Sequence, residues 1–70
     1  MVWKLASFRP VRAATDTEAA RIFAQRLARR LYGARGRVRL VQHAGGHPHG
    51  FDVYVSGARA GTHAYLELVK

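Results

Sequence analysis

Hydrophobic residues recur at helical spacing in one segment of the chain, between residues 15 and 33. They form a stripe that would face a core, at Ala20, Phe23, Ala24, Leu27 and Leu31. Thr15 and Glu18 have the spacing of a capping box, in which the Thr15 hydroxyl accepts a hydrogen bond from an early backbone N–H. Gly33 supplies a residue that tolerates the left-handed conformation in which helices commonly end. The pattern therefore predicts one amphipathic helix between these caps.

Three later segments alternate hydrophobic and polar residues with the period of two that is typical of strands. They span residues 37–43, 51–56 and 63–69, and turns that contain glycine separate them. Residues 2–9 are apolar and aromatic enough for a further strand, which Pro10 would end. The predicted order is β-α-β-β-β. We expect an α+β fold in which the helix covers one face of a four-stranded, mostly antiparallel sheet.

The alternation also sorts the side chains of the three later strands between the two faces of the sheet. The face under the helix is expected to hold Val38, Leu40, Phe51, Val53, Val55, Ala64, Leu66 and Leu68. The open face is expected to hold Arg37, Arg39, Val41, His43, Tyr54, His63, Tyr65, Glu67 and Val69. Trp3 or Lys4 would join the open face, according to the register of the first strand. Because one helix cannot cover both faces, the open face is an amphipathic and aromatic surface.

Size and charge narrow the classes of partner. The chain has 70 residues, of which 49% are hydrophobic, a composition that suits one small folded domain over residues 1–70. Its net charge is +8, and all of the excess falls in residues 1–39, which hold Lys4 and nine arginines against Asp16 and Glu18. Such an excess favours a polyanionic partner, either nucleic acid or an acidic protein. So small a core also makes any uncovered apolar surface a candidate for self-association.

The location of the protein is inferred from what the sequence lacks. It has no cysteine, and therefore neither a disulfide framework nor a thiolate site. No run approaches the roughly 18 apolar residues of a membrane span. Lys4 and Arg9 interrupt the N-terminal segment too closely for a signal peptide. We therefore expect a cytoplasmic protein with no membrane partner.

Arginines and tyrosines are the candidate residues for nucleic-acid binding, because arginine neutralises phosphates and tyrosine stacks on unpaired bases. The candidate set is Arg21, Arg26, Arg29, Arg30, Arg35, Arg37, Arg39, Arg59, Tyr54 and Tyr65. Three other interpretations stay open. Tyrosine is an ordinary strand former, most charge runs on helices are solvated surfaces, and the open face would also serve as the interface of a homodimer.

Histidines form the candidate metal site. His43, His47 and His49 lie in or beside a glycine-rich turn, where imidazoles would gather around a transition metal. Their spacing matches no zinc signature, so we expect no metal and no other cofactor.

Catalytic residues are not recognisable in the sequence. Asp16 and Glu18 are explained by the helix start, while Asp52 and Glu67 lie on different strands. No nucleophile or phosphate-loop motif is present. The sequence therefore predicts a non-enzymatic binding module, with nucleic acid as the first candidate partner. The alternative is a small homo-oligomeric protein whose open sheet face is a protein–protein interface.

Overall fold

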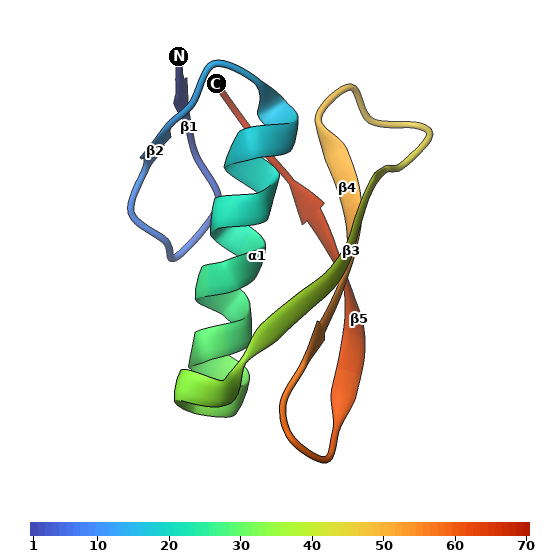
Figure 1. Cartoon of the computed structure of the whole chain (residues 1–70). Coiled ribbons are helices and arrows are strands. Elements are labelled where there is room, and N and C mark those ends of the chain that lie inside the picture. The colour runs from blue at the N-terminus through green and yellow to red at the C-terminus, as the bar shows by residue number, and fades with distance from the viewer.

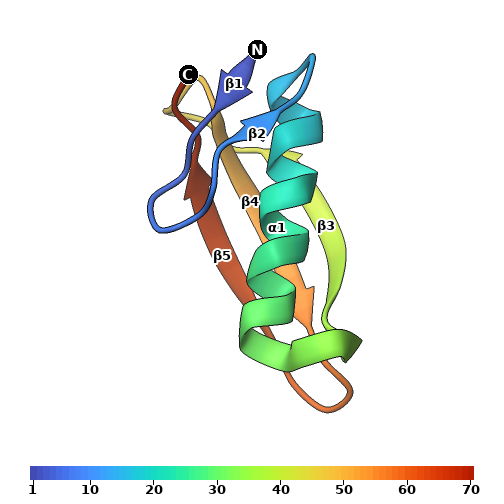
Figure 2. The same ribbon diagram turned by 90° about the vertical axis from the view of Figure 1, so that its left-hand side faces the viewer.

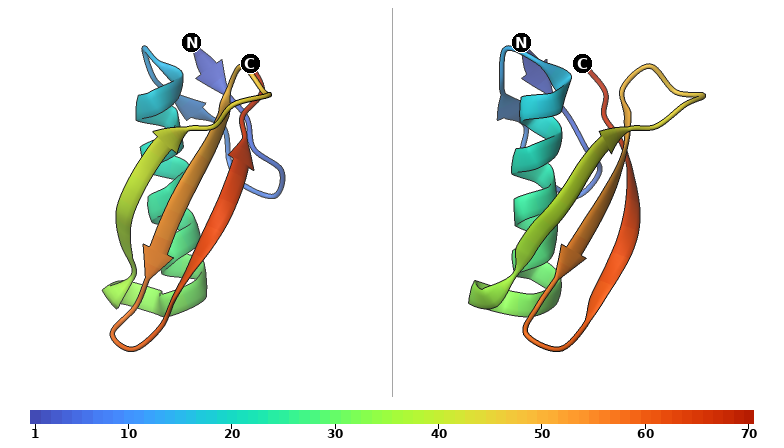
Figure 3. Two further views of the ribbon diagram at one scale, coloured as in Figure 1. Left: turned by 90° about the vertical axis from the view of Figure 1, so that its right-hand side faces the viewer. Right: turned by 45° about the vertical axis from the view of Figure 1, so that its right-hand side comes forward.

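One long helix and a three-stranded antiparallel sheet form the two main layers of the structure (Figure 1). The computed structural model describes every residue from Met1 to Lys70. Helix α1 spans Asp16–Tyr32, and the sheet consists of β3 (Arg37–His43), β4 (Gly50–Ser56) and β5 (Gly61–Glu67) in that order. A 3-10 turn, η1 (Gly33–Arg35), connects α1 to β3. Figure 3 shows the sheet with the helix behind it, so that one face of the sheet is open. The α+β class is confirmed.

The prediction of a first strand that belongs to a four-stranded sheet is wrong. Residues 2–9 do not form one strand: β1 spans only Val2–Trp3, the chain turns at Ser7 with a φ of 63°, and it returns as β2 (Val11–Arg12). Together β1 and β2 form a separate two-stranded antiparallel sheet next to the first half of α1 (Figure 2). The physical reason is burial, because Leu5, Phe8 and Val11 all pack against the core and an extended segment could not bring them there.

Trp3 attaches this N-terminal hairpin to the rest of the molecule. Its side chain is buried, and its indole N–H donates a hydrogen bond of 3.2 Å to the Ala13 carbonyl. The next residue, Lys4, forms an isolated antiparallel bridge to Val69. This bridge connects the hairpin to the end of the larger sheet, and it turns Trp3 toward the core and Lys4 toward the hollow beside Tyr65.

The predicted ends of the helix are confirmed. The Thr15 hydroxyl accepts a hydrogen bond of 3.2 Å from the Glu18 backbone N–H, and Gly33 ends the helix with a φ of 71°. The buried face differs from the predicted stripe, since Leu31 is 52% exposed. Small residues recur every three to four positions on that face, and Tyr32 continues it instead of Leu31. The buried residues of α1 are Ala19, Ala20, Phe23, Ala24 and Ala28. The helix is not long and apolar enough to cross a membrane.

A β-bulge at Arg39 places the side chains that follow it in β3 on the faces opposite to those predicted. Val38 lies opposite Val55, but the next pair is Leu40 with Tyr54, so Arg39 is the extra residue. Because one extra residue exchanges the faces of all that follow, Val41 packs against the core and Leu40 is 41% exposed. His43 is likewise on the helix side, opposite Phe51. The predictions for Leu40, Val41 and His43 are therefore wrong.

The other strands have the faces that alternation predicts. Phe51, Val53 and Val55 of β4 are fully or almost fully buried under α1, and Leu66 and Leu68 are buried in the same core. Burial of one such side chain contributes about 1.5–3 kcal/mol to the free energy of folding. On the opposite face, Tyr54 lies next to His63 and Tyr65 lies next to Asp52 across the β4–β5 pair.

Gly36 allows β3 to start directly against α1. A side chain at this position would collide with the Ala28 carbonyl and would lie 2.9 Å from the Arg29 backbone nitrogen. Both groups belong to the helix backbone, which has no freedom to move aside. The absence of a side chain at Gly36 thus sets the distance between the helix end and the sheet.

We expect Gly36→Ala to lower the free energy of unfolding by about 1–3 kcal/mol, because the added methyl group is overpacked against helix backbone. Urea denaturation followed by the fluorescence of Trp3 measures the change. Gly45→Ala is the matched control, since a methyl group added there would have no other atom within 4 Å and the backbone conformation is an ordinary one. Equal stability of the two variants would contradict this account of Gly36.

Candidate nucleic-acid interface

Charged side chains are sorted along the long axis of the molecule, which measures 33 Å. Figure 1 places the start of α1, the β3–β4 loop and both termini at one end, and η1 and the β4–β5 turn at the other. All four carboxylates lie in the half with the termini, in the first turn of α1, near the start of β4 and at the end of β5. The opposite end carries Arg35, Arg37, Arg39 and Arg59, which we call the basic end. No carboxylate lies there.

Two adjoining hollows occupy the basic end. The larger has a volume of about 480 Å³, and Arg35, Arg37 and Arg39 line it. The smaller has a volume of about 220 Å³, and Arg39 and Arg59 line it. The hollows share the walls formed by Arg39, Ser56, Gly57 and Ala58. Alanines are the only hydrophobic residues of the larger hollow, so its chemistry suits an anion and not an apolar ligand.

Three local features determine where the backbone places these arginines. Tyr32 packs so closely on Gly57 that a side chain there would lie 2.9 Å from the tyrosine ring, which fixes the β4–β5 turn under the end of α1. The turn is closed by a hydrogen bond of 2.7 Å from the Gly57 N–H to the Ala60 carbonyl. The bulge then keeps Arg39 on the open face with Arg37 while Val41 enters the core. Sequence reasoning missed the contact between Tyr32 and Gly57, for which the glycine in the turn was the only signal.

The arginine and lysine side chains have no carboxylate partners anywhere in the structure. The two close contacts between a basic and an acidic side chain, His47 with Glu67 at 4.0 Å and His49 with Asp16 at 3.0 Å, both involve histidine. All ten arginines and both lysines are therefore free of acidic neighbours within ion-pair distance. This leaves the charge of the basic end available to an external anion.

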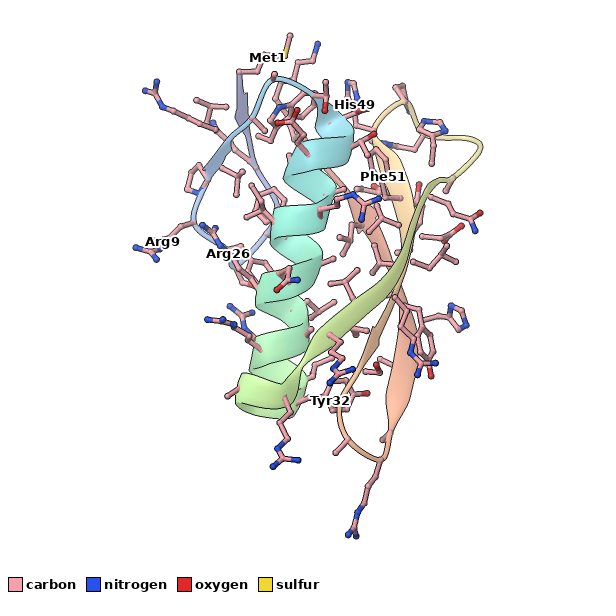
Figure 4. The ribbon with its side chains drawn as sticks, in the orientation of Figure 1. Met1, Arg9, Arg26, Tyr32, His49 and Phe51 are labelled. Carbon is pink, nitrogen blue, oxygen red and sulfur yellow. The ribbon has the colours of Figure 1, made fainter.

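The candidate arginines of α1 do not share one role. The Arg26 guanidinium donates to the Arg9 carbonyl at 2.8 Å, and Arg30 donates to the side chain and carbonyl of Ser7 at 3.2 Å each. Arg30 also stacks over Phe8, with 4.1 Å between its Cζ and the ring centroid. In Figure 4 the labelled Arg26 side chain reaches toward the N-terminal hairpin. These two arginines thus fasten the hairpin to the helix.

The other two helix candidates are free. Arg21 and Arg29 are exposed and make no side-chain hydrogen bond. Neither of them lines the hollows at the basic end. The structure therefore brings together four of the eight candidate arginines and leaves the helix arginines apart from them.

The two candidate tyrosines lie in different electrostatic surroundings. Tyr54 lines the smaller hollow beside Arg39 and Arg59. Tyr65 lies between the carboxylates of Asp52 and Glu67. Desolvation raises the pKa of the Tyr65 hydroxyl, and Glu67 and Asp52 raise it further. Only Tyr54 is therefore placed to act together with the basic end.

The three candidate metal ligands do not converge. His43 contacts the Pro48 carbonyl at 3.0 Å, His47 accepts from the His49 backbone N–H at 3.2 Å, and the His49 Nδ1–H donates to Asp16 at 3.0 Å. No group of three or more histidine, aspartate or glutamate side chains is close enough to hold a metal ion. The histidines instead order the β3–β4 loop.

His49 connects that loop to the start of α1, as Figure 4 shows for the labelled side chain. Its ring also meets the edge of Trp3, with 4.9 Å between the centroids. The hydrogen bond from His49 lowers the pKa of Asp16 below the usual 3.8, burial opposes this shift, and the Thr17 backbone N–H adds to it. This contact was not foreseen, because capping alone explained Asp16.

Comparison with protein-family models, with curated proteins and with solved structures finds no significant match to this chain. Geometry and charge therefore carry the functional assignment.

Asp16 should make stability depend on pH. Since its pKa is lower in the folded than in the unfolded protein, the ionised carboxylate stabilises the fold above pH 3.8, and this stabilisation is lost as the pH falls through the folded-state pKa. We expect Asp16→Asn to lower the free energy of unfolding at pH 7 by about 1 kcal/mol. The difference from the unmodified protein should shrink toward pH 3, as measured by urea denaturation. Glu18→Gln, which removes the other acid of the first turn, is the control for the helix dipole. A difference that is the same at both pH values would rule out this role for Asp16.

Proposed function

We propose that the protein is a non-enzymatic module that binds nucleic acid through its basic end. One observation carries this proposal: Arg35, Arg37, Arg39 and Arg59 line two adjoining hollows in a region without any carboxylate. Four arginines that line adjoining hollows, without acidic partners, repel each other and bind mobile counterions. A chain of phosphates relieves that repulsion and releases the counterions.

The chemistry of arginine suits phosphate in particular. A guanidinium presents planar, paired N–H donors that match two oxygens of a phosphate. The surface is too long for a single small anion, because the two hollows together extend from η1 along β3 to the β4–β5 turn. A polymer of regularly spaced phosphates fills such a surface better than an isolated ion. A nucleic-acid partner and a chain without cysteine both fit a cytoplasmic location.

Catalysis has no part in this proposal. Asp52 and Glu67, the two carboxylates on the sheet, flank Tyr65 in the half of the molecule away from the basic end. Asp16 is engaged by His49. The carboxylates that would act as acid or base are therefore separate from the phosphate-binding surface.

Removal of Arg37 and Arg39 should weaken binding and make it less dependent on salt. Each phosphate contact contributes about −0.9 to the slope of log affinity against log salt for duplex DNA. We expect the double variant Arg37→Ala/Arg39→Ala to have a slope shallower by about 1.8, if each arginine makes one contact. Fluorescence anisotropy of labelled duplex DNA and single-stranded RNA at several salt concentrations, from roughly 50 to 200 mM, gives the slope.

The matched control is Arg9→Ala/Arg12→Ala, which removes the same charge from the N-terminal hairpin. Both residues are exposed, and Figure 4 shows the Arg9 side chain pointing away from the molecule. Equal losses in the two double variants would mean that net charge, and not the basic end, determines binding. If no nucleic acid binds at low salt while polyglutamate does, the partner is an acidic protein.

The open sheet face supports a second candidate function, a homodimer. Leu40, Tyr65 and Val69 are 41%, 45% and 57% exposed, and all three belong to this face. Arg37 and Arg39 lie at one end of the face, and Asp52 and Glu67 lie toward the other. A two-fold axis that lies in the interface and runs across the strands would bring the positive end of one copy onto the negative end of its partner. Opposite charges would then meet across the interface, and the exposed apolar residues of the two copies would cover one another.

Leu40→Asp should convert such a dimer to a monomer, because the new carboxylate would be buried in the interface without a partner. Sedimentation equilibrium over a range of protein concentrations measures the molecular mass. Leu31→Asp is the control, since Leu31 is at least as exposed but lies on α1, outside the open face. A monomer at every concentration before any substitution would exclude this function.

A further inference from the structure

Tyr54 is the only tyrosine of the open sheet face that adjoins the basic end. We infer that the basic end is specific for single-stranded nucleic acid, with one unpaired base stacked on Tyr54 and the neighbouring phosphates on Arg39 and Arg59. This inference rests on the proposed function and adds to it the class of nucleic acid and the residue that selects it.

The sheet presents the Tyr54 ring directly beside the phosphate-binding hollows. Tyr54 and Gly61 lie on neighbouring strands, and the tyrosine side chain extends over the glycine, so that a side chain at Gly61 would collide with the Tyr54 hydroxyl. The ring therefore lies along the sheet instead of standing out from it. Gly61 and Tyr54 both line the smaller hollow, which extends from the ring to Arg59.

Arg39 links the ring to the arginines. Its Cζ lies over the Tyr54 ring, 5.9 Å from the centroid, so a stacked base would share that ring with the guanidinium, and the same side chain lines both hollows. A phosphate bound by Arg39 would thus lie within the reach of one nucleotide from a base on Tyr54. The His63 ring, 4.8 Å from Tyr54 at an angle of 60°, limits how far that base can move across the sheet.

An aromatic ring in this position discriminates between single and double strands. In a duplex the faces of the bases are stacked on one another, so a ring on a protein surface meets only phosphates and base edges. In a single strand the faces are free, and stacking on an aromatic side chain adds affinity without regard to sequence. Tyr54 therefore contributes to the binding of single strands alone, whereas the arginines contribute to both.

Tyr65 is a natural comparison, because it has the same ring on the same face. It lies over Gly50 as Tyr54 lies over Gly61. Its neighbours are Asp52 and Glu67 in place of Arg39 and Arg59. A nucleotide stacked on Tyr65 would bring its phosphate toward two carboxylates, so this ring does not take part in binding.

The test compares Tyr54→Ala with Tyr65→Ala on two probes, oligothymidylate and an abasic strand with the same number of phosphates. Anisotropy titrations at low salt give the affinities. Tyr54→Ala should weaken the binding of oligothymidylate by roughly 5- to 150-fold, the range for one stacked base. It should leave the binding of the abasic strand unchanged, and Tyr65→Ala should change neither. Tyr54→Phe, which keeps the ring, should bind both probes as the unmodified protein does.

The outcomes separate this inference from the function on which it rests. If Arg37→Ala/Arg39→Ala weakens both probes and Tyr54→Ala weakens neither, nucleic-acid binding stands and the stacking site is overturned. The same holds if Tyr54→Ala and Tyr65→Ala have equal effects, or if a dimer covers the sheet face while oligothymidylate is bound. If neither the arginine nor the tyrosine variants alter binding, the proposed function fails as well. Tyr54→Leu, which preserves apolar bulk on the sheet, replaces Tyr54→Ala if the alanine variant does not fold.

Discussion

The close packing of the alanine face of α1 on the sheet is the constraint on which the remaining structure depends. Four alanines and Phe23 are buried on that face, so the helix backbone comes near the strands. Only a residue without a side chain fits where β3 leaves the helix, and Gly36 stands there. Tyr32 then packs on Gly57, which carries the β4–β5 turn beneath the helix end. The proximity of Arg35 and Arg59, far apart in the sequence, follows from this packing.

Charge separation follows from the same architecture. All four carboxylates lie in one half of the molecule: Asp16 is bound by His49, Glu18 is in the first turn of α1, and Asp52 and Glu67 lie near Tyr65. None is left to neutralise the arginines at the opposite end. A charge of +8 on a chain of this size opposes its own folding through repulsion, and no internal ion pair of an arginine offsets it. A polyanion at the basic end would relieve this repulsion, so its binding would also stabilise the fold.

The helix and the three later strands could be predicted from the sequence, because capping residues and a period of two are local signals. Thr15, Gly33 and the buried side chains of β4 and β5 are where those signals indicate. The exposed Leu31 and the hairpin at Ser7 could not be predicted, since burial in the assembled core decides them and the positive φ of Ser7 is uncommon for a residue other than glycine. The bulge at Arg39 leaves no mark in the hydrophobic pattern, because Val38, Leu40 and Val41 suit either face. For the candidate site, the sequence was enough to predict that arginines and a tyrosine would form it. The grouping of Arg59 with Arg35, Arg37 and Arg39, and the separation of Tyr54 from Tyr65, depend on the tertiary fold.

The bulge has one more consequence, which concerns aggregation. β3 is an edge strand of the sheet, and the outer side of such a strand offers unpaired backbone groups to any other extended chain. A regular strand of valine and leucine in that position would invite the growth of fibrils. The irregular backbone at Arg39 interrupts the ladder that an incoming strand would need, and the positive charges of Arg37 and Arg39 repel a second copy aligned in parallel. Arg39, which belongs to the basic end, thus also protects a small and exposed sheet from aggregation.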